Sequence, residues 1–250
     1  MMAFLRAEWL KTKRTALRWL VFALPVLTGA VLGWYCSGRA WISAADAYSG
    51  FFSVWTNLLS LLIGIVGGQL VEEEAQAGAF SGFLALPRPR RALYLGKLAA
   101  LLLSMALANV LAVASVVAVL QMTGTLMLSP SLYALTMAMI LIASVPICAL
   151  SLWLSLGAGM GASVGVGICG VLLAAIVGGT NLGNALWPVV PWAWPVRFCA
   201  FAALLYEGGL APVLYNQLKL GCAVVAISGI LFIIGGVRWF SRWDGRATGD

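Results

Sequence analysis

The sequence predicts an all-α integral membrane protein with six transmembrane helices. Hydrophobic residues make up 62% of the 250 residues and charged residues only 9%. A soluble domain carries roughly 25% charged residues, so this chain cannot cover its surface with groups that favour water. Six uncharged, mostly apolar windows have about the 20-residue length that crosses the hydrocarbon core of a bilayer.

The windows follow one another along the chain without overlap. They are Trp19–Gly38, Phe51–Val71, Leu98–Leu120, Tyr133–Leu156, Ser163–Thr180 and Leu220–Val237. The first is longer than the 7–15 apolar residues of a secretory signal, so we interpret it as a retained span. A glycine-rich turn at residues 157–161 is all that separates the fourth window from the fifth.

The basic residues predict the orientation of the chain. All 15 Lys and Arg except Arg39, Arg197 and Lys219 lie at the two termini or between the second and third windows. An even number of spans places these three segments on one side of the membrane. Basic residues accumulate on the cytoplasmic side, so both termini are predicted to be cytoplasmic.

The N-terminal segment 1–18 mixes apolar residues, among them Leu5 and Trp9, with a run of Lys and Arg. A basic amphipathic helix with tryptophan typically lies in the plane of the interface. We therefore predict an interfacial helix before the first span. The alternative is an ordinary basic flank.

The absent residue types exclude several classes of function. The chain has no histidine and eight acidic residues, all outside the six windows. Intramembrane catalysis and ion coupling usually need ionisable groups within the spans. No phosphate-binding G-x-x-x-x-G-K-[S/T] loop occurs either. We predict that the chain is not an enzyme, holds no metal or cofactor itself and binds no nucleic acid.

Small and amide side chains are the notable features inside the windows. Gly64 with Gly68, and Gly161 with Gly165, have the four-residue spacing of helix-packing faces, within the subunit or across a dimer. A G-x-G-x-x-G pattern at residues 165–170 lies inside a span and lacks the strand and acidic residue of a dinucleotide site. We therefore interpret it as a packing surface.

Two asparagines, Asn57 and Asn109, lie in the second and third windows. Amides in spans hydrogen-bond between helices, and contact with a transported substrate is the alternative. The segment 181–219 before the last window contains Trp187, Trp192 and Trp194, which we expect to anchor at the headgroup layer. Its apolar run 198–206 is too short to cross, which predicts a re-entrant or interfacial outer segment. Its tryptophans either only anchor the chain or, with the asparagines, contribute to a substrate path.

The segment 72–97 between the second and third windows is the candidate docking surface. Three acids begin it, two prolines interrupt it and basic residues end it. We predict a short amphipathic helix with exposed phenylalanines, a turn at Pro87 and Pro89, and a basic return helix. The residues expected to contact a partner are Glu72, Glu73, Glu74, Phe80, Phe83, Arg88 and Arg91.

This segment resembles the coupling region of ABC-2 type permeases, and more narrowly that of lantibiotic-immunity and lantibiotic-export permeases. The similarity runs from Glu73 or Glu74 through Gly78, Leu86-Pro87 and Tyr94 to Lys97. The N-terminal residues 7–15 and the stretch 191–197 are similar to two further patches of that family. Pro89 departs from the family, in which a small polar residue is commoner at this position.

The resemblance implies one permease domain over residues 1–250, in a bacterial cytoplasmic membrane. Two permease subunits would pair above two ATP-binding subunits, which would hold ATP and Mg²⁺. The implied function is export of an amphiphilic peptide substrate of the lantibiotic type, which confers self-immunity. The alternatives are an ABC-2 permease for another cargo, such as a lipid, antibiotic or drug, and a non-transporting membrane scaffold or sensor subunit.

Overall fold

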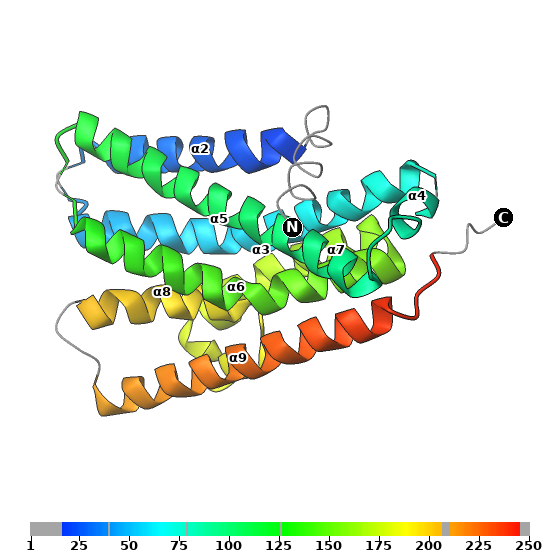
Figure 1. Ribbon diagram of the computed structural model, residues 1–250. Coiled ribbons are helices and arrows are strands. Elements are labelled where there is room, and N and C mark those ends of the chain that lie inside the picture. The colour runs from blue at the N-terminus through cyan, green and yellow to red at the C-terminus, as the bar shows by residue number, and fades with distance from the viewer. Residues whose placement is uncertain (1–16, 40, 79, 126, 207–210, 246–250) are drawn as a thin grey trace.

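The computed structural model of the protein is a bundle of long helices that run lengthwise beside one another (Figure 1). It describes residues 17–245 except 40, 79, 126 and 207–210. The predicted interfacial helix at 1–18 therefore lies almost wholly outside the described residues. Six helical segments are long and apolar enough to cross a membrane, as predicted.

These six segments alternate in direction along the bundle. They are α2 (Leu17–Cys36), α3 (Ala44–Gln76), α5 (Arg90–Met122), α6 (Pro130–Ala158), the continuous segment of α7 (Met160–Leu173) and the π-helical turn η2 (Ala174–Gly178), and α9 (Pro212–Phe240). The shorter elements are α4 (Ser81–Leu84), the 3₁₀ turns η3 (Asn181–Gly183) and η4 (Trp187–Val189), and α8 (Ala193–Tyr206).

The two ends of the bundle differ in charge. The α4 connection, the junction of α6 with α7 and the C-terminal end of α9 gather at one end, here called the charged end (Figure 1). It carries Arg88, Arg90, Arg91, Arg238 and Arg242. Helices α2, α5 and α8 end at the opposite, far end (Figure 1).

Helices α3 and α5 are longer than their predicted spans. Each has 33 residues, about 50 Å of helix, against a bilayer core of about 30 Å. Both extend past the start of α2 at the charged end (Figure 1). Within the segment 72–97, residues 72–76 belong to α3, and residues 90–97 form the start of α5, where a basic return helix was predicted. No glycine or proline lies between Gly68 and Gly78, so the helix continues through its three glutamates.

Glycine allows close approach of α3 and α7. A Cβ added to Gly64 would lie 2.7 Å from the Ser163 carbonyl oxygen, and one on Gly68 would lie 2.8 Å from Met160. Gly161 and Gly165 differ, because nothing lies within 4 Å of their Cβ positions. They do not pack within the subunit, so that part of the expectation is wrong. Packing across a dimer stays a prediction for this pair.

Candidate functional site

The connection between α3 and α5 forms a compact knob at the charged end. After α3 ends at Gln76, the one-turn helix α4 begins behind Phe80, whose backbone is left-handed with φ of 67°. The Phe80 amide donates to the Glu74 carbonyl at 3.2 Å. The turn predicted at the two prolines is present, because α4 ends at Leu84 and Pro89 precedes the first residue of α5.

Phe80 and Phe83 face inward. Their side chains are only 2% and 3% exposed, so the prediction of exposed phenylalanines is wrong. The Phe80 ring meets Trp243 edge-on, with centroids 4.9 Å apart, and the Phe83 ring lies 6.1 Å from Phe240. The end of α9 and the residues just after it cover the two rings, which a local sequence pattern could not indicate. Leu86 and Arg88 are exposed on the knob instead.

A buried ion pair lies beneath the knob. Lys97 Nζ is 2.8 Å from Glu74 Oε1 and also donates to the Leu70 carbonyl at 2.9 Å. The Phe83 ring centroid is 5.4 Å from the same ammonium, within the range of a cation–π contact. The Glu74 side chain is therefore buried within the subunit, contrary to the expectation that it faces a partner. Nothing in the sequence pattern marks two residues 23 positions apart as a pair.

A second contact ties α5 to the segment after α9. Arg90 donates to the Trp243 carbonyl and lies 3.1 Å from an Asp244 carboxylate oxygen. The knob itself is held on α5 by the contact of Phe83 with Lys97, and on the end of α9 and the residues after it by its two phenylalanine rings. The ion pair and Arg90 join the surrounding helices to one another. No motif in the sequence pointed to Phe240, Trp243 and Asp244 as part of this site. The aromatic residues that follow the last predicted span were the available signal.

The two span asparagines behave differently. Asn109 Oδ1 accepts from Trp55 Nε1 at 2.9 Å, and its amide nitrogen donates to the Met137 carbonyl at 3.2 Å. Asn109 therefore joins α3, α5 and α6. Asn57 donates to the Ser53 carbonyl of its own helix at 2.7 Å, and its buried Oδ1 has no hydrogen-bond partner among the described residues. An interhelical bond expected at both positions is present only at Asn109.

Two of the tryptophans at the start of α8 and before it, Trp187 and Trp194, lie inside the bundle. Trp194 Nε1 donates to the Trp187 carbonyl at 3.1 Å, and both side chains are buried. The Trp192 ring packs on Gly170, where an added Cβ would lie 2.3 Å from it. The prediction that Trp187 and Trp194 anchor at the headgroup layer is therefore wrong. The η3–η4 segment folds back along the bundle, and Trp187 packs on Gly221 of α9.

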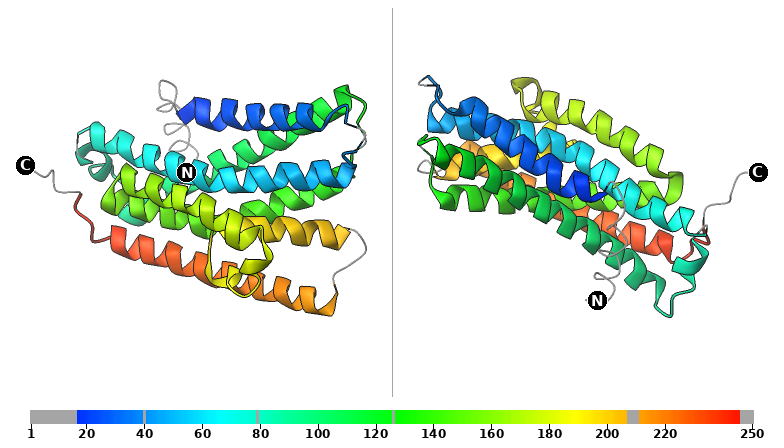
Figure 2. Two further views of the ribbon diagram at one scale, coloured as in Figure 1. Left: turned by 180° about the vertical axis from the view of Figure 1, so that it is seen from behind. Right: turned by 90° about the horizontal axis from the view of Figure 1, so that it is seen from above.

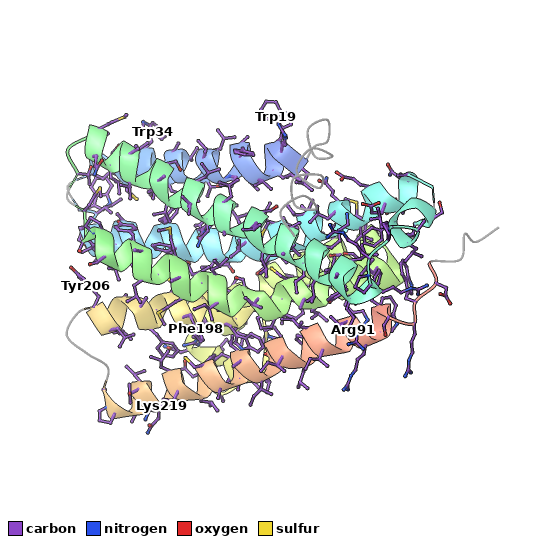
Figure 3. All side chains as sticks on the ribbon, viewed as in Figure 1. Trp19, Trp34, Arg91, Phe198, Tyr206 and Lys219 are labelled. Atoms are coloured by element: carbon purple, nitrogen blue, oxygen red, sulfur yellow. The ribbon has the colours of Figure 1, made fainter. Side chains whose placement is uncertain are left out.

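Helix α8 runs lengthwise beside the long helices and ends toward the far end, where Figure 3 labels Tyr206 (Figures 2 and 3). A groove of about 320 Å³ separates part of α8 from α3, with Tyr48, Ser53 and Thr56 on one wall and Arg197 on the other. The Arg197 guanidinium donates to the carbonyls of Val177 at 3.1 Å and Thr180 at 2.8 Å. It thereby satisfies carbonyl groups at the end of η2.

The part of the chain that the structure describes contains no cluster of three or more Cys, Asp or Glu side chains able to hold a metal ion. The family model described as ABC-2 family transporter protein matches residues 4–178, more than half of the chain. The chain belongs to the ABC-2 transporter family. The match includes α2 to η2 and the whole α4 knob. A comparison with curated proteins finds no significant match.

As an ABC-2 family transporter protein, the chain is a multi-pass membrane subunit without an ATPase domain. ABC-2 permeases generally pair with separate ATP-binding subunits. The match confirms the resemblance to ABC-2 permeases noted in the sequence. It identifies the family and does not assign a subfamily.

Proposed function

We propose that this ABC-2 subunit is the permease of an exporter whose charged end faces the cytoplasm. The basic residues collected at that end support this orientation, because they accumulate on the cytoplasmic side of membrane proteins. A partner ATP-binding subunit would hold ATP and Mg²⁺ and dock on the α4 knob. A second permease subunit, of the same or another sequence, would complete the pair.

The observation that carries the docking proposal is the anchorage of α4. A force applied to the knob reaches α3 through the hydrogen bond from the Phe80 amide to the Glu74 carbonyl. It reaches α5 through the contact of Phe83 with Lys97, and α9 through the contact of Phe83 with Phe240. Rigid, two-sided attachment is what an element needs to pass on movement from a partner. Phe80 and Phe83 hold the knob in this scheme, and the exposed Leu86 and Arg88 contact the partner.

The exposed charge of the knob favours a specific register for the partner. Arg88 is exposed on the knob, while Glu72 and Glu73 are half-buried on the last turns of α3. Complementary charges across an interface fix orientation more than they add affinity. Arg91, also expected in the docking surface, lies beside the end of α9 (Figure 3), so we leave it out of the contact.

Co-purification tests the docking surface. Leu86→Ala/Arg88→Glu should reduce recovery of the co-expressed ATP-binding subunit at least about tenfold, since each central contact is worth over about 1 kcal/mol. Lys219→Glu changes an exposed cation on α9 near the far end (Figure 3) and should leave recovery unchanged. Equal recovery with both variants contradicts docking on the knob.

For the cargo, we propose an amphiphilic peptide of the lantibiotic type, with self-immunity as the outcome of export. The similarity of three sequence patches to lantibiotic permeases supports this choice. The groove between α3 and α8 supports it as well, because it presents aromatic rings, hydroxyl groups and one guanidinium together. Such a mixed lining suits a molecule with apolar and polar faces.

Vanadate-sensitive release of a lantibiotic from cells that express the assembled complex tests the cargo. Release that depends on both chains is the expected result. An assembled complex without release, but with ATPase activity stimulated by a lipid or drug, assigns another cargo. A chain that assembles with no ATP-binding subunit is a scaffold or sensor, which overturns the permease proposal itself.

A further inference from the structure

A second groove lies at the charged end, apart from the tip of the α4 knob. It has a volume of about 620 Å³, and three arginines and two tryptophans form most of its lining. These residues are Arg91, Arg238, Trp239, Arg242 and Trp243; Ser241 and Asp244 complete it. The groove thus joins the first turn of α5 to the end of α9, and we call it the α9 groove.

The α9 groove carries uncompensated positive charge. Arg91, Arg238 and Arg242 are exposed, and none of them forms an ion pair with another residue in the part of the chain that the structure describes. Asp244, the acid in the lining, is paired with Arg90. Three guanidiniums around one cavity favour a ligand with a phosphate or other oxyanion, which arginine binds through several donors at once.

An apolar face of α9 leads directly into the groove. Ile227, Leu231 and Ile234 are exposed and follow one another at helical spacing toward Arg238. α9 also has the smallest buried share of the six spans, which leaves this face open to lipid. The two tryptophans at its end are half-buried, as expected for rings at the boundary between hydrocarbon and water.

We propose that the α9 groove binds the headgroup of an anionic phospholipid. The three arginines hold the phosphate, the tryptophan rings pack against the glycerol region, and one acyl chain lies along the face of Ile227, Leu231 and Ile234. Basic pockets at the membrane ends of helices bind anionic headgroups in this way. A soluble acidic protein surface matches the arginines but not the apolar face, which lies within the hydrocarbon.

Lipid titration of the purified full-length chain tests the proposal. Native mass spectrometry would count bound phosphatidylglycerol and phosphatidylcholine of identical acyl chains. We expect a clear preference for phosphatidylglycerol. Arg91→Gln/Arg238→Gln/Arg242→Gln should weaken phosphatidylglycerol binding on the order of a hundredfold, from about fivefold per basic residue. The corresponding triple Lys variant should retain most of the binding.

Two control variants separate this site from the docking surface. Arg88→Gln changes the knob outside the groove and Lys219→Gln lies on α9 near the far end, so neither should alter lipid preference. Should the triple variant fail to fold, Arg242→Gln, beyond the end of α9, should still weaken binding about fivefold.

Three results would overturn the proposal. The first is equal binding of the two lipids by the unaltered chain. The second is a triple Gln variant that keeps its lipid preference but loses the ATP-binding subunit, which would assign the groove to that partner. The third is a result in which glycerol phosphate binds as tightly as the lipid. The acyl chain would then contribute nothing to the affinity.

Discussion

Lys97 Nζ lies 2.8 Å from Glu74 Oε1, with side chains only 2% and 9% exposed. The pair joins α3 to α5 at the level where the chain leaves α3 for α4. Lys97 also donates to the Leu70 carbonyl, which adds a backbone contact to the ion pair. Buried charges of this kind stabilise a fold only while both partners are present.

Replacing one partner of this pair should therefore lower the free energy of unfolding more than replacing both partners. Lys97→Met or Glu74→Gln leaves a buried group without its partner, and we expect a loss of roughly 3–5 kcal/mol in the free energy of unfolding. Glu74→Leu/Lys97→Met should recover most of that loss. Unfolding in detergent by denaturant titration measures all three. A double variant less stable than either single one contradicts the structural role of the pair.

Glycine should be better tolerated than alanine at position 80, the reverse of the usual order in an ordered segment. Phe80 has a φ of 67°, a left-handed conformation that costs a residue with a Cβ roughly 1 kcal/mol. Both replacements lose the contact with Trp243, but only Phe80→Gly also relieves the backbone. We expect Phe80→Ala to be about 1 kcal/mol less stable than Phe80→Gly. The comparison needs only thermal unfolding midpoints, and equal midpoints count against the left-handed turn.

Gly64→Ala should destabilise the bundle by about 1–3 kcal/mol. Its added methyl group would lie 2.7 Å from the Ser163 carbonyl oxygen and push α7 away from α3. That shift would also disturb the hydrogen bond from Ser163 Oγ to the Gly64 carbonyl, which is 2.9 Å long.

Gly161→Ala and Gly165→Ala are the matched controls for Gly64→Ala. Neither added methyl group meets another atom within 4 Å, so the stability of the subunit should change by less than about 0.5 kcal/mol. Weaker self-association of these two variants, measured by crosslinking, would place their face in a dimer contact. A loss of monomer stability as large as that of Gly64→Ala contradicts the packing described.

Asn109→Leu should lower stability by about 1 kcal/mol, because interhelical hydrogen bonds in membranes are typically worth roughly 0.6–2 kcal/mol. Trp55→Phe removes the same bond from the other side. The double variant should therefore lose less than the sum of the two single losses. Transport that falls while stability stays constant would assign Asn109 to substrate contact instead.

Much of the architecture follows from composition and local pattern. The six spans are predictable because a chain with so few charges must bury its backbone polar groups in helices within lipid. The turn after α4 is predictable as well, since Pro87 and Pro89 cannot continue a helix. The resemblance to ABC-2 permeases rests on letters in the same connection, and the family match confirms it.

The direction in which each side chain of the knob points could not be predicted in this way. The sequence predicts Glu74 and Phe83 as docking residues because the local pattern contains charges and aromatic rings beside a turn. Their burial depends on Lys97 and Phe240, which arrive from α5 and α9. The same holds for Trp194, which lies inside because the chain before α8 folds back into the bundle.

The sequence alone was thus sufficient for the number of spans, the family and the collection of basic residues at one end. These depend on transfer free energies and local backbone preferences, which each segment carries independently of the rest of the chain. The tertiary structure alone decided that Phe80 and Glu74 anchor the knob, that Asn109 joins three helices and that Arg91 shares a groove with α9. Those outcomes depend on contacts between helices far apart in the chain, where packing and the pairing of buried polar groups select among arrangements that local sequence leaves equally possible.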